Sequence, residues 1–170
     1  MYKVLFVCTG NICRSPTAEG VFKALIKSYR LSDQLETDSA GIGSWHEGSS
    51  PDPRPVATAK ARGVDISKQK ARTFKKQDFK EFDLVLCMDS SHEKHLLNLC
   101  PANLRYRIRL FLDYAPEIET SDVPDPYFDG NEGFEKVYDM IKIAAIGLIE
   151  EIKKYSLSSN EETYKDTKKG

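Results

Sequence analysis

The sequence lacks the features that would assign the chain to a membrane, to the secretory route or to nucleic acid. No apolar stretch reaches the roughly 20 residues of a membrane span, and the first residues lead directly into a short apolar run unlike a signal peptide. Basic and acidic residues nearly cancel, at 25 and 26, so the net charge of −1 gives no bulk attraction to nucleic acid or anionic lipid. These absences predict a cytoplasmic protein with no membrane or nucleic-acid partner.

Cysteine is also scarce, and the positions of the four cysteines exclude two common roles. A chain of 170 residues can bury a core without a disulfide framework, and it contains no CxxC pair of the kind found in zinc sites. His92 and His95 fall one residue short of the HExxH zinc motif, so we interpret both as exposed helix residues, with a metal site as the minor alternative. We therefore expect no metal and no other cofactor.

The candidate catalytic residues lie in one stretch near the N-terminus. Residues 4–7 form a short apolar run typical of a buried strand, and Ser15-Pro16 is typical of a helix start, with the serine as cap. A tight loop between a strand and a helix N-terminus turns its amides inward, and the helix dipole adds to the attraction for an anion. We expect this loop to form an anion-binding cradle, with Cys8 at its floor and Arg14 at its rim.

A cysteine below a bound oxyanion favours attack of sulfur on phosphorus, with a cysteinyl-phosphate intermediate. The field of the cradle favours the thiolate of Cys8, and Arg14 offers a planar fork that suits two phosphate oxygens. The alternative for a bare C-x5-R spacing is a buried cysteine and an arginine at a helix terminus. The strand before the loop, Gly10 inside it and the Ser-Pro pair after it together favour the catalytic interpretation.

Apolar runs alternate with amphipathic segments along the chain, which predicts an α/β sandwich around a central parallel sheet. Strands are expected near residues 4–7, 35–42, 83–88 and 107–112, and helices over 15–30, 56–62, 90–100 and 131–155. We predict one domain over 1–155 and a disordered polar tail over 156–170, in which Tyr164 is a phosphorylation candidate.

The motif CTGNICRSPTAEG at 8–20 resembles the phosphate loop of the low-molecular-weight protein tyrosine phosphatases. Further matches follow in order: DSAG at 38–41, Trp45, SPDPR at 50–54, LCMD at 86–89 and DPYFDG at 125–130. The resemblance covers about residues 2–155. It implies four strands in the order 2-1-3-4, with helices on both faces, and metal-independent hydrolysis of phosphotyrosine and other aryl phosphates.

The resemblance also selects the proton donor. Four aspartates lie in the loop 113–130, and composition cannot rank them; all four could simply cap or turn the loop. The DPYF match singles out Asp125 as general acid for the leaving oxygen and then as base for the attacking water. The LCMD match at 86–89 implies that Asp89 pairs with Arg14. The four aspartates are Asp113, Asp122, Asp125 and Asp129.

Other residues of the loop and pocket receive supporting roles. The amides of residues 9–14 should stabilise the phosphate oxygens, Asn11 should brace the loop, and Ser15 should hydrogen-bond the sulfur of Cys8. Two interpretations of Cys13 stay open: it is a small buried side chain, or it is a redox partner of Cys8. The phosphate-loop residues are Thr9, Gly10, Asn11, Ile12, Cys13 and Ser15.

Aromatic residues are expected to form the substrate slot. The resemblance implies that Trp45 faces Tyr127 and Phe128 across a pocket deep enough for a phosphotyrosine ring; the alternative is that the latter two anchor their loop to the core. Two positions depart from the family pattern: Phe128 stands where many relatives have tyrosine, and Gln69 where a histidine often supports the phosphate loop. Beside the pocket, Asp52 and Arg54 are predicted to form a local ion pair.

Two other functions remain possible from the sequence. A thiol-dependent arsenate reductase would use a similar loop but needs resolving cysteines on a mobile segment, for which Cys87 and Cys100 are poorly placed. A module that only binds oxyanions would need neither a nucleophile nor an acid. The expected partner is therefore a phosphotyrosine protein or a small aryl phosphate, with the chain as a monomer or weak homodimer.

Overall fold

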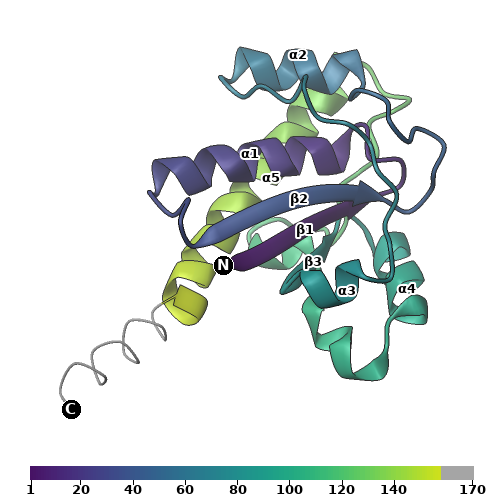
Figure 1. Cartoon of the computed structure of the whole chain (residues 1–170). Helices are drawn as coiled ribbons and strands as arrows, with labels where there is room; N and C mark the ends of the chain where they lie inside the picture. Colours follow the sequence, from purple (N-terminus) through teal and green to yellow (C-terminus); the bar gives the residue numbers. More distant parts are fainter. Residues whose placement is uncertain (158–170) are drawn as a thin grey trace.

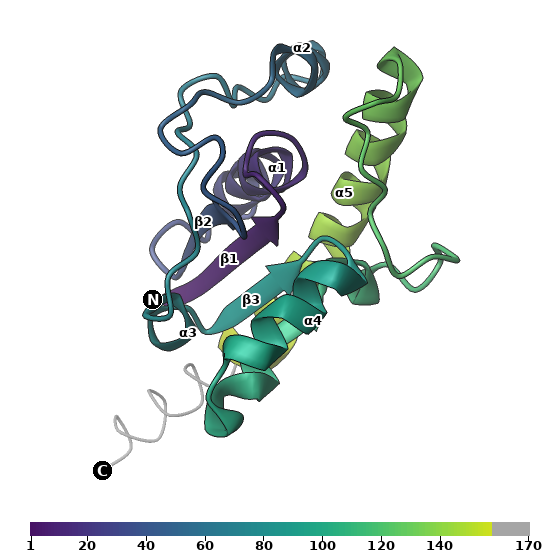
Figure 2. The ribbon, with the colours of Figure 1, turned by 90° about the vertical axis from the view of Figure 1, so that its right-hand side faces the viewer.

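The computed structural model describes residues 1–157, in which a four-stranded parallel sheet has the order β2-β1-β3-β4. The predicted order is therefore confirmed. Figure 1 shows β2, β1 and β3 of this sheet. The strands are β1 (Tyr2–Cys8), β2 (Leu35–Gly41), β3 (Leu84–Cys87) and β4 (Ile108–Leu110). Cys8 is level with Gly41 and Val7 with Cys87, so the carboxyl ends of the central strands share one edge (Figure 2). Strand β2 lies on one side of β1 and β3 lies on the other, so the order of the strands reverses at β1. Open α/β sheets bind ligands at such a point.

Helices cover both faces of the sheet. The helices are α1 (Arg14–Ser28), α2 (Pro53–Ala61), α3 (Asp78–Glu81), α4 (Ser90–Leu99) and α5 (Asn131–Ile152). Figure 1 shows α1, α2 and α5 on one side of the strands and α3 and α4 on the other. This is the predicted three-layer sandwich. Within residues 1–157, no helix has both the length and the apolar character needed to cross a membrane.

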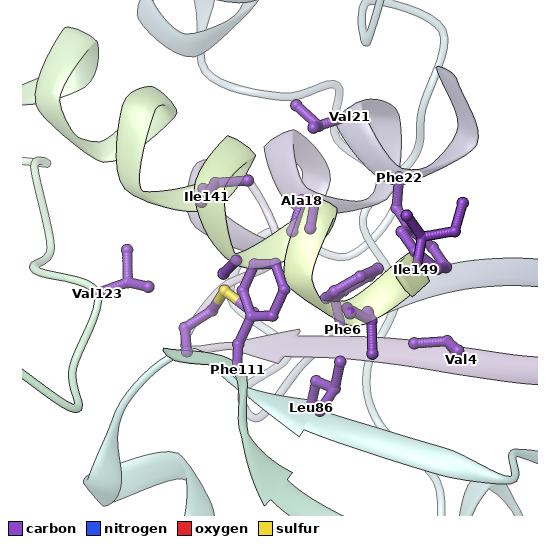
Figure 3. Packing of buried hydrophobic residues seen from close by; sticks show 14 of the residues in the cluster. Val4, Phe6, Ala18, Val21, Phe22, Leu86, Phe111, Val123, Ile141 and Ile149 are labelled. Carbon is purple, nitrogen blue, oxygen red and sulfur yellow. The ribbon is translucent and has the colours of Figure 1, made fainter. Parts of the chain in front are cut away.

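Strand β1 is the centre of the core because both of its faces are buried. Val4 and Phe6 join the cluster beneath α1 and α5, while Leu5 and Val7 join the cluster beneath α3 and α4. A strand buried on both faces reads as a continuous apolar run, as residues 4–7 do. Figure 3 shows Phe6 at the centre of the first cluster. This packing fixes the end of β1 from which the loop to α1 departs.

Edge-to-face aromatic contacts join α1 to the sheet. The ring of Phe6 lies 5.7 Å from that of Phe22 on α1 and 5.0 Å from that of Phe111, just beyond β4 (Figure 3). Such contacts add stabilisation to the burial of the rings themselves. The start of α1 and the end of β1 are therefore held in one rigid unit.

Several predicted boundaries differ from the structure. Helix α1 begins at Arg14, with Cys13 at the cap position, and the side chain of Ser15 contacts Cys8 and does not cap the helix. Strand β4 ends at Leu110, since the chain then enters a 3₁₀ turn. After α5 a helical turn continues to Leu157, which is buried in the core two residues beyond the predicted domain boundary. The rest of the predicted tail, including Tyr164, lies outside the described residues.

Helices α2 and α4 each have an aspartate cap at the N-terminus. Asp52 accepts the N–H of Arg54 at 2.9 Å and forms the predicted ion pair with its guanidinium at 2.8 Å. Asp89 caps α4 by accepting the N–H groups of Ser91 and His92. Both caps lie at the carboxyl edge of the sheet, so they also order the loops around the candidate site.

Candidate active site

The loop between β1 and α1 presents its backbone donors inward. The carbonyl oxygens of Cys8, Thr9 and Ile12 accept backbone N–H groups of the segment 42–52, at 2.9, 3.0 and 3.0 Å. Among residues 1–157, no acceptor takes the N–H groups of residues 9–13. Because these three carbonyls are occupied and the amides of residues 9–13 are free, the loop can surround an anion with donors at the N-terminus of α1.

Asn11 holds the loop in this shape. Its backbone lies in the left-handed region at φ 57°, which asparagine tolerates better than most residues. Its side-chain Nδ2 donates to the hydroxyls of Ser15 and Ser39 at 2.8 and 2.9 Å. Its Oδ1 accepts the N–H of Arg72 at 3.0 Å, which fixes the orientation of the amide. The expected bracing role of Asn11 thus has a complete set of partners.

Ser15 contacts the candidate nucleophile instead of capping the helix. Its Oγ lies 2.9 Å from the Sγ of Cys8, as expected from the sequence. Since Asn11 already donates to Ser15, the hydroxyl proton of Ser15 can point to the sulfur at 2.9 Å or to the carbonyl of Ala40 at 3.5 Å, and the sulfur is the nearer acceptor. Ser15 is therefore placed to donate a hydrogen bond to the sulfur of Cys8.

The guanidinium of Arg14 is buried and held from several directions. Its Nη1 donates to Asp89 Oδ2 at 2.8 Å and to the carbonyl of Val123 at 3.0 Å. Its Nη2 lies 3.3 Å from Thr9 Oγ1 and 3.7 Å from Asp125 Oδ2. The expected pairing with Asp89 is present, and it positions the guanidinium at the rim of the loop.

The charge of Asp89 persists despite its partial burial. Burial alone would raise the pKa of this carboxyl, but hydrogen bonds from Ser91 and Arg14 outweigh that effect and keep the pKa below its usual value. Asp89 is therefore an anionic partner for Arg14 across the neutral pH range.

Only one of the four loop aspartates reaches the cavity above the phosphate loop. This cavity has a volume of about 180 Å³, and Cys8, Arg14 and Asp125 all line it. The carboxyl of Asp125 accepts the N–H of Tyr127 at 3.1 Å and is half-exposed. Asp122 instead accepts the N–H of Ser90 at the start of α4. The structure thus separates residues that composition could not rank.

The aromatic slot differs from the prediction in one member. Trp45 and Tyr127 line the cavity, but Phe128 does not, and it is 93% exposed. The ring of Phe128 packs only edge-on against Tyr127, at 4.9 Å. Tyr127 is held by Arg54, which donates to its carbonyl at 2.7 Å and lies over its ring. Phe128 follows Tyr127 in the turn, and its ring is exposed. It therefore neither lines the cavity nor anchors its loop to the core, which were its two predicted roles.

Two histidines near the loop were missed as site residues. His46 lines the cavity beside Trp45. His92, predicted as exposed, is only 2% exposed, and its Nε2 lies 2.8 Å from Thr9 Oγ1. Burial lowers the pKa of His92 to about 4. The available signal was its place three residues after the cap Asp89, the position from which a side chain reaches back to the cap N–H.

Cys13 lies in the loop, and Gln69 lies beside the first turn of α1. Cys13 is buried, and burial raises the pKa of its thiol to about 12. All four cysteines are free, so a redox pairing of Cys8 with Cys13 stays a prediction. Gln69 donates to the carbonyl of Pro16 at 3.0 Å, and so it supports the first turn of α1 rather than the phosphate loop itself.

Known proteins are similar to this chain in sequence and in fold over most of its length. The family model described as low molecular weight phosphotyrosine protein phosphatase matches residues 3–157. A low molecular weight protein-tyrosine-phosphatase of Streptomyces coelicolor is 42% identical over 151 residues, which are 87% of this chain and 92% of that protein.

Solved structures are similar over the same length. A protein tyrosine phosphatase from Entamoeba histolytica, with Hepes in its active site, has a TM-score of 0.88 at 39% identity and covers 91% of this chain and 98% of its own. Wzb of Vibrio vulnificus, in complex with benzylphosphonate, has a TM-score of 0.77 at 30% identity and covers 88% of this chain and 98% of its own.

Proposed function

The chain belongs to the low molecular weight phosphotyrosine protein phosphatase family, and from this premise we propose that Cys8, Arg14 and Asp125 perform the hydrolysis. As a member of the family it is a protein tyrosine phosphatase that acts through a cysteine and without a metal ion. The observation that carries the assignment of residues is their meeting in one cavity above the phosphate loop.

In the first step the thiolate of Cys8 attacks phosphorus, and the bond from phosphorus to the leaving oxygen breaks. Asp125 gives its proton to that oxygen, so tyrosine or another alcohol departs neutral. The amides of residues 9–14 and the guanidinium of Arg14 receive the charge that spreads over the equatorial oxygens. The free loop amides and the constrained guanidinium support these roles.

In the second step water attacks the cysteinyl-phosphate, and Asp125 accepts its proton. The sulfur of Cys8 leaves as a thiolate, which the hydroxyl of Ser15 at 2.9 Å stabilises. Inorganic phosphate is then released. One carboxyl thus serves as acid and then as base, and the enzyme returns to its starting state.

The proposed substrates are phosphotyrosine proteins and small aryl phosphates. Trp45 and Tyr127 provide apolar walls above the loop, which suit an aromatic ring whose phosphate reaches Cys8. The complex of the relative Wzb with benzylphosphonate, an aryl-bearing phosphonate, supports the same class of ligand. Cys87, which is fully buried, and Cys100 do not line the cavity, so nothing favours the arsenate-reductase alternative.

A cytoplasmic location is part of this proposal. Four free cysteines, one of them the nucleophile, are compatible with a reducing compartment. The state of the chain as a monomer or weak homodimer, and its lack of nucleic-acid and membrane partners, remain predictions.

The test is release of phosphate from a phosphotyrosine peptide in EDTA and a reducing agent. Wild type is expected to hydrolyse the peptide, and Cys8→Ser is expected to lose turnover while still binding phosphate. Thermal unfolding of both proteins controls for loss of fold. A folded wild type without activity, or a Cys8→Ser variant with undiminished turnover, contradicts the assignment.

A further inference from the structure

The hydroxyl of Thr9 has an environment that the mechanism above does not use. Thr9 lines the cavity directly after the nucleophile, and its side chain is exposed there. Two nitrogen groups surround its Oγ1: His92 Nε2 at 2.8 Å and Arg14 Nη2 at 3.3 Å. Arginine can only donate, so the direction of the hydrogen bond with His92 decides where the Thr9 proton points.

The backbone of Asp89 settles that direction. Its N–H, which can only donate, lies 3.2 Å from His92 Nδ1, so this nitrogen must accept. The neutral ring then carries its proton on Nε2 and donates it to Thr9. The opposite tautomer would leave the Asp89 N–H without an acceptor. It would also direct an Nδ1 proton at Asp89 Oδ1, which already accepts from the backbone and hydroxyl of Ser91 and from the backbone of His92.

The protonation state of the ring agrees with this arrangement. His92 is buried beneath the loop, and burial lowers its pKa to about 4, so the ring is neutral near pH 7. A doubly protonated ring would set its Nδ1 proton against the Asp89 N–H. The tautomer is therefore determined by contacts on both sides of the imidazole.

Both acceptor positions of the Thr9 hydroxyl are thus occupied by N–H donors, from His92 and Arg14. Its own proton must point elsewhere, and the remaining direction available to an exposed side chain at this position is the cavity. We propose that the Thr9 hydroxyl donates a hydrogen bond to a phosphoryl oxygen of the substrate, and that His92 is the positioning residue that orients it. The inference rests on the proposed function and adds one side-chain donor to the loop amides and Arg14.

The first test compares Thr9→Val with Thr9→Ser. Valine keeps the shape of threonine but removes the hydroxyl, so kcat/KM for p-nitrophenyl phosphate is expected to fall roughly tenfold, the typical effect of one hydrogen bond to a charged group. The inhibition constant of inorganic phosphate is expected to rise by a similar factor. Serine keeps the donor and is expected to recover most of both losses.

The second test separates the two contacts of His92. In His92→Gln the amide can accept the Asp89 N–H and still donate to Thr9, as glutamine does at this position of a capping box. In His92→Asn the shorter side chain can keep the contact with Asp89 but cannot reach Thr9. We expect glutamine to retain most of the activity and asparagine to reproduce the loss seen in Thr9→Val.

The double variant Thr9→Val/His92→Asn completes the design. Because His92 acts through Thr9, the asparagine change is expected to add little once the hydroxyl is gone. Equal phosphate inhibition of wild type and Thr9→Val overturns the role of Thr9, and full additivity in the double variant overturns the role of His92. Either failure would occur with an active wild type, whereas failure of the proposed function is an inactive wild type.

Discussion

At the scale of single residues, the candidate site assigns different duties to chemically identical side chains. Asp89 is bound to Arg14 and caps a helix, Asp122 orders the start of α4, and Asp125 alone faces the cavity. Which aspartate can exchange a proton with substrate is therefore a matter of position and exposure.

Replacement of Asp125 tests this division. Asp125→Asn removes the proposed acid and base but keeps the shape, so kcat is expected to fall about 10²–10⁴-fold while phosphate still binds. Asp113→Asn is the matched control, because Asp113 is exposed and does not line the cavity. Steady-state kinetics with an aryl phosphate measure both. Equal losses in the two variants, or none in Asp125→Asn, would be inconsistent with the assigned role.

At the scale of elements, the N-terminus of α4 connects helix capping to the phosphate loop. Asp89 caps the helix and holds Arg14, while His92 accepts the cap N–H and contacts Thr9. A change at this helix end is therefore expected to affect both stability and the site.

The buried imidazole of His92 predicts how stability depends on pH. Its pKa is about 4 in the folded protein, against an ordinary value of 6.5. Between these values the unfolded chain binds the proton and the folded protein does not, so acidification favours unfolding. The contribution of His92 to the free energy of unfolding is complete above about pH 6.5. It falls by roughly 3 kcal/mol as the pH approaches 4, because each pKa unit corresponds to 1.36 kcal/mol.

Urea unfolding at several pH values between 4 and 7.5 measures this dependence. His92→Gln, which has no titrating group, is expected to show a shallower decline of the free energy of unfolding than wild type over this interval. His95→Gln is the control, because His95 is exposed on the same helix. Parallel curves for wild type and His92→Gln would argue against a buried neutral ring.

At the scale of the whole molecule, a single core supports the site from below. The end of β1 and the start of α1 are joined through Phe6 and Phe22, and Phe111 closes the same cluster (Figure 3). The phosphate loop joins these two elements, so its shape depends on this unit.

Phe6→Ala is expected to destabilise the protein by about 3–5 kcal/mol, the usual cost of removing a buried aromatic ring. Phe128→Ala is the matched control, since that ring is 93% exposed and its loss is expected to change stability by less than about 0.5 kcal/mol. Denaturant unfolding of both variants provides the comparison. Similar stabilities for the two would mean that the core is not organised around Phe6.

The fold and the core of the site were predictable because their signals are local. Residues 4–7 are apolar without interruption, as a doubly buried strand requires, and the strand–loop–helix pattern of 8–20 specifies an anion cradle. The family resemblance supplied the strand order and pointed to Asp125. These features depend on neighbours in the chain or on motifs long enough to recognise.

Only the tertiary structure decided the direction in which particular side chains point. Serine often caps helices, but Ser15 contacts Cys8. Phe128 lies outside the cavity, and His92 is buried against Thr9. Thr9 and His92 are 83 positions apart, and they meet because β1 and β3 are adjacent parallel strands whose carboxyl ends share one edge. Local pattern determines which elements form, whereas contacts between distant elements determine which polar groups find partners.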